Sequence, residues 1–100
     1  MIAVGVMSGT SADGINVAFV EIGGRGFTTR FRLLAHDEFP FPAAVRAKIL
    51  SLMNARDARV ADLSQLNVLL GELYARAVAA AGKRAGIRKL ALVGCHGQTL

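Results

Sequence analysis

Residues 7–16 read MSGTSADGIN, and this polar stretch lies between two apolar runs. Strands are expected on either side of it, over residues 2–7 and 15–22. Two such runs joined by a short, glycine-containing polar segment predict a β-hairpin. At its tip, Gly9 and Gly14 are expected to allow positive φ and close approach of the backbone to a ligand. The hairpin is therefore the first candidate for a binding site.

The groups at this tip suit the oxygens of a phosphate. Thr10 and Ser11 supply hydroxyls, and Asp13 supplies a carboxylate that suits a hydrated divalent cation nearby. The two commoner nucleotide motifs are absent from the loop: no Lys follows a glycine, and no G-x-G-x-x-G opens a helix. An ordinary turn rich in Gly, Ser and Asp explains the same residues through backbone preferences, so the loop alone leaves both interpretations open.

A second polar segment, residues 96–99, reads HGQT and also follows an apolar run. Together the two segments resemble the anhydro-N-acetylmuramic acid kinase family. That family carries M-S-G-T-S-x-D-G-x-D near its start and H-G-Q-T after a later strand. The resemblance covers essentially the whole chain. The long first motif is specific, whereas the second would be modest evidence alone.

The resemblance implies a kinase that uses ATP and water to open the 1,6-anhydro ring of anhydro-N-acetylmuramic acid. It implies phosphorylation at O6 to N-acetylmuramic acid 6-phosphate, a step of peptidoglycan recycling. ATP and Mg²⁺ are the expected cofactors, and an amino sugar is the expected small-molecule partner. The resemblance also allows a homodimer of the full-length enzyme.

The same resemblance assigns the site residues. Those expected to bind the nucleotide are Gly9, Thr10, Ser11, Ala12, Asp13, Gly14, Ile15 and Asn16. Among them, Asp13 is also the candidate for holding the metal through water. Those expected to bind the sugar are His96, Gly97, Gln98 and Thr99. No catalytic residue is assigned, because the general base is expected beyond Leu100.

The chain departs from the family's pattern at two positions. Asn16 stands where the family usually has Asp, and Cys95 stands where Ser often precedes the His. Asn keeps one acceptor oxygen but loses the negative charge. Asn16 therefore weakens the site if that Asp holds the metal through water, and is tolerated if it hydrogen-bonds the backbone. The alternatives are another sugar kinase or ATPase of the same fold, or a non-catalytic nucleotide-binding relative.

The order of the remaining elements predicts the fold class. After the hairpin we expect a turn at 23–26, a strand over 27–37, a helix over 43–54, a helix from an N-cap at Asp62 to a C-cap at Gly82, and a strand over 89–94. Three strands joined by short turns form an antiparallel meander, and a strand–helix–strand passage adds the last strand in parallel. This order matches the first half of the actin, hexokinase and heat-shock ATPase type of α/β domain, in which phosphate binds at the first hairpin.

The composition indicates whether the chain can form a core and a complete domain. The 100 residues are 53% hydrophobic and only 19% charged, which indicates a core and a surface meant to be covered by further chain. We therefore expect residues 1–100 to be the N-terminal part of a longer domain, truncated at Leu100 and inactive by itself.

The charge pattern and the single Cys indicate which partners and which cellular location to expect. The formal charge is +5, but the basic residues are scattered without interleaved aromatics, so a nucleic-acid partner is not expected. No apolar run has the length of a membrane span, and the start lacks the features of a signal peptide. A single Cys excludes an intrachain disulfide and favours a reducing, cytoplasmic location.

Overall fold

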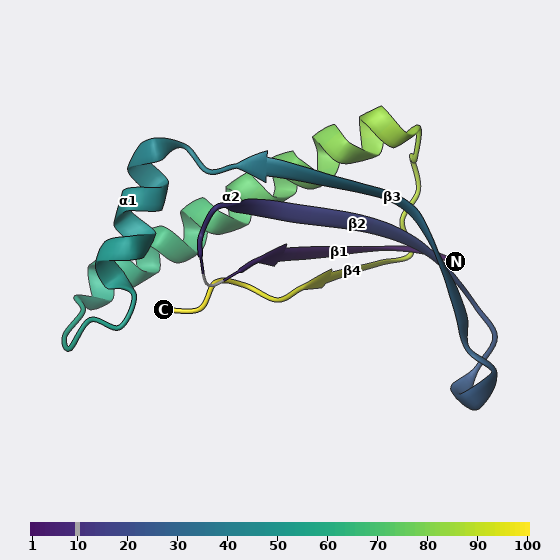
Figure 1. The fold of residues 1–100 in the computed structure, drawn as a ribbon, viewed down its shortest axis with the longest axis horizontal. Coiled ribbons are helices and arrows are strands. Elements are labelled where there is room, and N and C mark those ends of the chain that lie inside the picture. The colour runs from purple at the N-terminus through teal and green to yellow at the C-terminus, as the bar shows by residue number, and fades with distance from the viewer. Residues whose placement is uncertain (10) are drawn as a thin grey trace.

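The computed structural model, which describes residues 1–9 and 11–100, holds a four-stranded mixed sheet and two helices (Figure 1). The strands are β1 (Ile2–Ser8), β2 (Gly14–Gly23), β3 (Arg30–Pro40) and β4 (Leu92–Cys95), and the helices are α1 (Ala43–Leu52) and α2 (Val60–Ala85). A short 3₁₀ helix, Gly26–Thr28, joins β2 to β3. The strand order across the sheet is β3-β2-β1-β4.

The sheet has the predicted connectivity. Strands β1 and β2 pair antiparallel, as do β2 and β3, which confirms the meander. Strand β4 then pairs with β1 in parallel, from Ala3 opposite Leu92 to Val6 opposite Cys95. The crossover that parallel pairing needs is made by α1 and α2. As a result, the ends of β1 and β4 lie side by side at one edge of the sheet (Figure 1).

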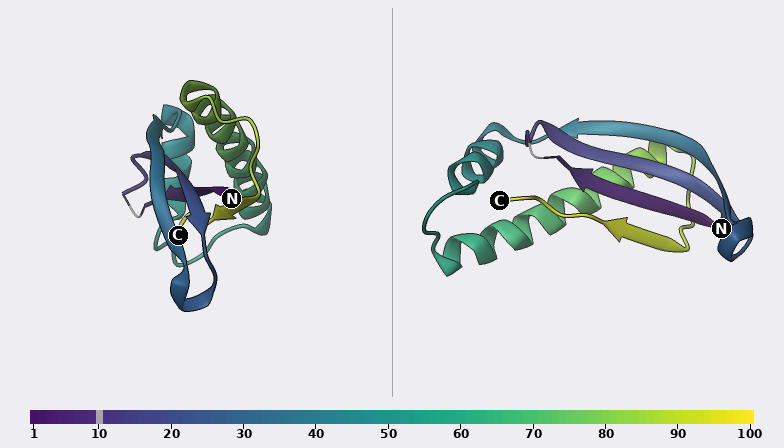
Figure 2. Two further views of the ribbon diagram at one scale, coloured as in Figure 1. Left: turned by 90° about the vertical axis from the view of Figure 1, so that its right-hand side faces the viewer. Right: turned by 60° about the horizontal axis from the view of Figure 1, so that its bottom comes forward.

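The core lies between one sheet face and α2. Because side chains alternate along a strand, Val17 and Phe19 of β2 point to the same face, and both are buried. They belong to one cluster with Leu66 and Ala77 of α2. Both helices lie on this side of the sheet (Figure 2), and on the opposite face Met7 of β1 is 48% exposed. That opposite face is therefore the open one.

The third strand differs from its predicted bounds at both ends. It begins at Arg30 rather than residue 27, because Gly26–Thr28 forms the 3₁₀ turn. It also continues through Pro40, beyond the predicted end at residue 37. Pro lacks an N–H to donate to a neighbouring strand, and β3 is an edge strand of the sheet, where this loss is tolerated.

The helix ends were also shifted. Asp62 does not cap α2: the helix begins at Val60, and Asp62 forms an ion pair with Lys48 at 3.0 Å. The helix continues past Gly82 to Ala85, and its C-cap is Gly86, whose φ of 72° is the left-handed conformation that glycine adopts readily. The predicted first helix and last strand exist with altered bounds, since α1 ends at Leu52 and β4 covers Leu92–Cys95.

Candidate functional site

The hairpin tip joins the end of β1 to the start of β2. The N–H of Ala12 donates to the carbonyl of Gly9 at 3.1 Å, which closes a turn. Ala12 is fully buried and has a φ of 53°, whereas neither Gly9 nor Gly14 has a positive φ. The prediction that the glycines supply the left-handed conformation was therefore wrong. Thr10, which was also assigned to nucleotide binding, lies outside the described residues.

The two glycines have different surroundings. A Cβ on Gly14 would lie 2.7 Å from the carbonyl oxygen of Phe39, so this glycine allows β2 and β3 to approach closely. A Cβ on Gly9 would meet no heavy atom within 4 Å. Packing within the described residues therefore requires glycine at position 14 but leaves open space beside position 9. Space beside a backbone is what a ligand of the loop needs.

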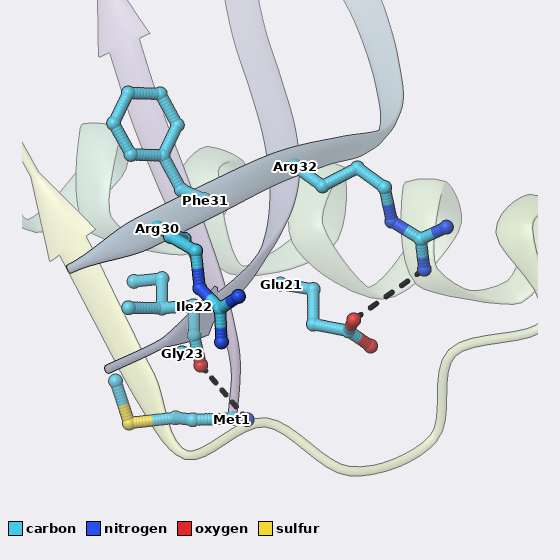
Figure 3. A pocket seen from close by; sticks show the side chains of 7 residues that line it. All are labelled: Met1, Glu21, Ile22, Gly23, Arg30, Phe31 and Arg32. Atoms are coloured by element: carbon cyan, nitrogen blue, oxygen red, sulfur yellow. Dashed lines mark hydrogen bonds and ion pairs between the residues drawn. The ribbon is translucent and has the colours of Figure 1, made fainter. Parts of the chain in front are cut away.

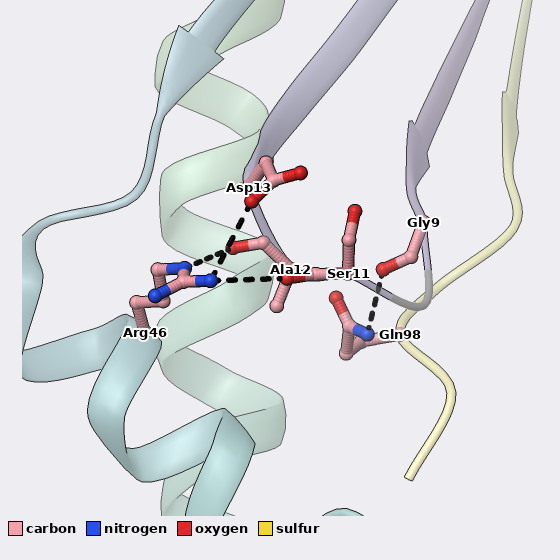
Figure 4. Close-up of polar contacts among 6 residues, drawn as sticks. All are labelled: Gly9, Ser11, Ala12, Asp13, Arg46 and Gln98. Atoms are coloured by element: carbon pink, nitrogen blue, oxygen red, sulfur yellow. Dashed lines mark hydrogen bonds and ion pairs between the residues drawn. The ribbon is translucent and has the colours of Figure 1, made fainter.

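An arginine that the sequence did not single out forms hydrogen bonds to one side of the loop (Figure 4). Arg46 extends from α1, and its Nε donates to the carbonyl of Ala12 at 3.2 Å. Its Nη2 donates to the carbonyl of Ser11 at 3.4 Å and lies 3.5 Å from Oδ1 of Asp13. Nothing in the local sequence distinguishes Arg46 from a solvated helix residue, because its partners lie more than 30 positions away.

On the opposite side of the loop from Arg46, Gln98 connects the two predicted site segments. Its Nε2 donates to the carbonyl of Gly9 at 3.1 Å and to the carbonyl of Thr99 at 3.1 Å. Its Oε1 accepts a hydrogen bond from the hydroxyl of Ser8, which is buried at the end of β1. The HGQT segment thus touches the hairpin directly, as the parallel pairing of β1 and β4 requires.

A hollow of about 600 Å³ lies on the open face of the sheet beside this junction. Its lining comes from all four strands and the ends of β1 and β4: Gly5, Val6, Met7, Gly9, Asn16, Ala18, His36, Gly94 and His96. It brings together three residues that the sequence assigned to a site, Gly9, Asn16 and His96. It also adds His36, whose Nε2 lies 3.1 Å from Oδ1 of Asn16.

The remaining assigned residues divide by exposure. Ser11 and Asp13 are exposed and accessible to a ligand. Ala12 and Ile15 belong to the buried core cluster, so only their backbone groups are available to a ligand. Gly97 has a φ of 85°, which makes it the glycine that turns the segment after β4.

No group of three or more His, Cys, Asp or Glu side chains within residues 1–9 and 11–100 is arranged to hold a metal ion. Asp13 is left as the candidate for a metal held through water. Over the same residues, no helix combines the length and apolar character needed to cross a membrane.

Tyr74 of α2 lies beneath the junction and is buried. Burial raises the pKa of its phenol, and the nearby Cys95 acts in the same direction. Its hydroxyl has no hydrogen-bond partner within the part of the chain that the structure describes. Because the phenol is neutral, the charged groups at the site are Asp13 of the hairpin loop and Arg46.

A second hollow, of about 400 Å³, lies at the other end of the sheet (Figure 3). There the N-terminal amine donates to the carbonyl of Ile22 at 3.2 Å, and Arg32 pairs with Glu21 at 3.4 Å. The ion pair is exposed, and such pairs contribute little. None of the residues assigned to a site lines this hollow, so the hairpin end is the better candidate.

Comparison with known proteins identifies relatives of the whole chain. The family model described as anhydro-N-acetylmuramic acid kinase matches residues 1–100. A protein of that name from Caldanaerobacter subterraneus subsp. tengcongensis is 43% identical over 101 residues, which cover 99% of this chain and 26% of the relative.

Two further relatives carry the same name. The protein from Bacillus thuringiensis subsp. konkukian is 38% identical over 102 residues, covering 100% of this chain and 27% of the relative. The protein from Vibrio vulnificus strain CMCP6 is 37% identical over 99 residues, covering 97% of this chain and 26% of the relative. The chain therefore spans about a quarter of the length of the curated relatives it matches.

Proposed function

Because this chain belongs to the anhydro-N-acetylmuramic acid kinase family, we propose that it is the N-terminal part of an ATP-dependent kinase for 1,6-anhydro-N-acetylmuramic acid. The full-length protein would open the anhydro ring with water and phosphorylate O6, giving N-acetylmuramic acid 6-phosphate. The proposal includes the actin and hexokinase type of fold, a cytoplasmic location, and a general base and adenosine pocket beyond Leu100.

One observation carries the proposal: the hydrogen bond from Gln98 Nε2 to the carbonyl of Gly9. Phosphoryl transfer depends on positioning, so the phosphate and the acceptor sugar must be bound next to each other. The two segments assigned to these ligands are 89 positions apart in sequence and joined by this bond. The hollow beside them, lined by both Gly9 and His96, offers space for an acceptor.

Each segment has a proposed role. The backbone amides and exposed hydroxyl of the hairpin loop, at Gly9 and Ser11, would bind ATP phosphates through hydrogen bonds. Asp13 would hold Mg²⁺ through water. The segment from His96 to Thr99 would bind the sugar, because its polar side chains and turned backbone can pair with hydroxyl and N-acetyl groups.

Turnover by the full-length protein tests the proposal. A coupled assay would follow ATP consumption with 1,6-anhydro-N-acetylmuramic acid and with N-acetylmuramic acid, and mass spectrometry would identify the product. We expect a 6-phosphate from the anhydro sugar. Phosphorylation of a different sugar would favour another kinase of this fold, and ATP binding without turnover would favour a non-catalytic relative.

Asn16→Asp should leave turnover unchanged or raise it, most visibly at low Mg²⁺. Asn16 Oδ1 already lies within hydrogen-bond distance of His36, and an Asp keeps that oxygen while adding a charge. The measurement is kcat at several Mg²⁺ concentrations. Asn54→Asp, the same change on an exposed loop, should alter nothing. A large loss of turnover in Asn16→Asp would mean that the position requires a neutral amide.

His96→Ala should raise the sugar's KM about tenfold and leave the KM for ATP unchanged. An unpaired polar group on the bound sugar would account for an effect of this size. The fold should persist, because the pairing of His96 uses its backbone N–H, which donates to Val6 at 3.0 Å.

Gln98→Ala gives the contrast to His96→Ala. Gln98→Ala removes the hydrogen bond to the Gly9 carbonyl in addition to a contact with the sugar, so the KM for the sugar and the KM for ATP should both rise. Steady-state kinetics with each substrate varied in turn separates the two patterns. If His96→Ala raised only the KM for ATP, the assignment of the two segments would be reversed.

A further inference from the structure

We propose that Arg46 is a positioning residue for the phosphate-binding loop and acts on it through two backbone carbonyls. This inference rests on the proposed function, because the loop is taken to bind the phosphates of ATP. Arg46 itself lies behind the loop and needs no contact with the nucleotide. Its partners are the carbonyls of Ser11 and Ala12 and the carboxylate of Asp13 (Figure 4).

The direction of these bonds determines how the loop presents its amides. A trans peptide is planar, and its C=O and N–H point in opposite directions. Since the Ala12 carbonyl accepts from Arg46, the N–H of Asp13 in the same peptide points away from the guanidinium. The Ser11 carbonyl likewise directs the N–H of Ala12 away, where it donates to Gly9. Arg46 therefore orients two successive peptides of the loop.

The fork of the guanidinium suits this task. Arg presents several donors in a fixed plane, so Nε and Nη2 can hold neighbouring carbonyls at the same time. The bond to Ala12 is partly buried, whereas Asp13 is 66% exposed and lies at the long distance of 3.5 Å. Exposed ion pairs contribute little, so the carbonyl bonds are the more important contacts.

The base of Arg46 is held in place by the core. Arg46 belongs to α1, and its neighbours Val45 and Ile49 in that helix are buried in the core cluster. The loop that Arg46 reaches contains Ala12, which is buried and left-handed at a φ of 53°. Left-handed backbone is uncommon for a residue other than glycine and persists only where its surroundings support it. Arg46 supplies part of that support.

The test compares Arg46→Gln, Arg46→Lys and a matched control in the full-length protein. Arg84→Gln is the control, because Arg84 makes a shorter ion pair, 2.9 Å to Asp37, and its hydrogen bonds among the described residues go to Asp37 rather than to the loop. We expect Arg46→Gln to raise the KM for ATP about tenfold with the sugar's KM unchanged. Arg46→Lys should recover part of this loss, since it keeps the charge but not the fork.

A second measurement works without ATP. Hydrogen–deuterium exchange of a peptide covering residues 7–16 should be faster in Arg46→Gln than in the wild type, and unchanged in Arg84→Gln. Wild-type exchange in Arg46→Gln, or an unchanged KM for ATP, would overturn the inference. Full recovery by Arg46→Lys would also overturn it, because charge alone would then suffice.

The two proposals fail in different ways. If the wild-type protein neither binds nor consumes ATP, the proposed function is wrong whatever Arg46 does. If the wild type is active and Arg46→Gln raises both KM values equally with a lower melting temperature, the role of Arg46 is only structural. In that case the kinase proposal stands and the positioning role is refuted.

Discussion

Gly9→Val in the full-length protein is expected to weaken ATP binding by about tenfold to a hundredfold without changing the melting temperature. The fold should tolerate the change, because a Cβ at Gly9 meets no heavy atom of residues 1–9 and 11–100 within 4 Å and Gly9 has no positive φ. A phosphate bound against this backbone would meet the added methyl groups, and overpacking of this kind costs about 1–3 kcal/mol. Isothermal titration with ATP measures the loss.

Gly71→Ala is the matched control for added bulk at a glycine. Gly71 is exposed on α2, and a Cβ there also meets nothing within 4 Å. This variant should bind ATP normally and melt at the same or a higher temperature, because Ala is the better helix former by about 1 kcal/mol. Wild-type ATP affinity in Gly9→Val would refute the assignment of the hairpin loop to the nucleotide.

Phe19→Ala is expected to lower the free energy of unfolding by about 3–5 kcal/mol. Phe19 lies in the middle of β2, is 1% exposed, and belongs to the cluster between the sheet and α2. Removing its ring loses buried apolar surface and leaves a cavity that the rigid sheet and helix can fill only in part. Urea unfolding of the full-length protein, followed by circular dichroism, measures the loss.

Phe31→Ala removes the same side chain from an exposed position. Phe31 lies on β3 and is 78% exposed, so its loss should change the free energy of unfolding by less than about 0.5 kcal/mol. A loss below about 1 kcal/mol in Phe19→Ala would mean that the core does not lie between the sheet and α2. Phe19→Ala should lose ATP binding only under conditions in which the variant is unfolded.

The elements of the fold were predictable where the signal is local. The apolar runs on either side of the polar loop identified β1 and β2, and the helical period identified α1 and α2. Boundaries were predicted less well, because residues far away in sequence decide them. Asp62 has the side chain of a helix cap but pairs with Lys48 of another helix. Pro40 reads as a break but is accommodated because β3 is an edge strand.

The sequence by itself determined the two polar segments of the site, the meander and the parallel addition of β4. Those features follow from residue type and order along the chain. Only the tertiary structure decided that Gln98 holds Gly9 and that Arg46 orients Ser11 and Ala12. The reason is physical: these bonds join residues 34 to 89 positions apart, and their geometry exists only after the sheet and α1 have packed.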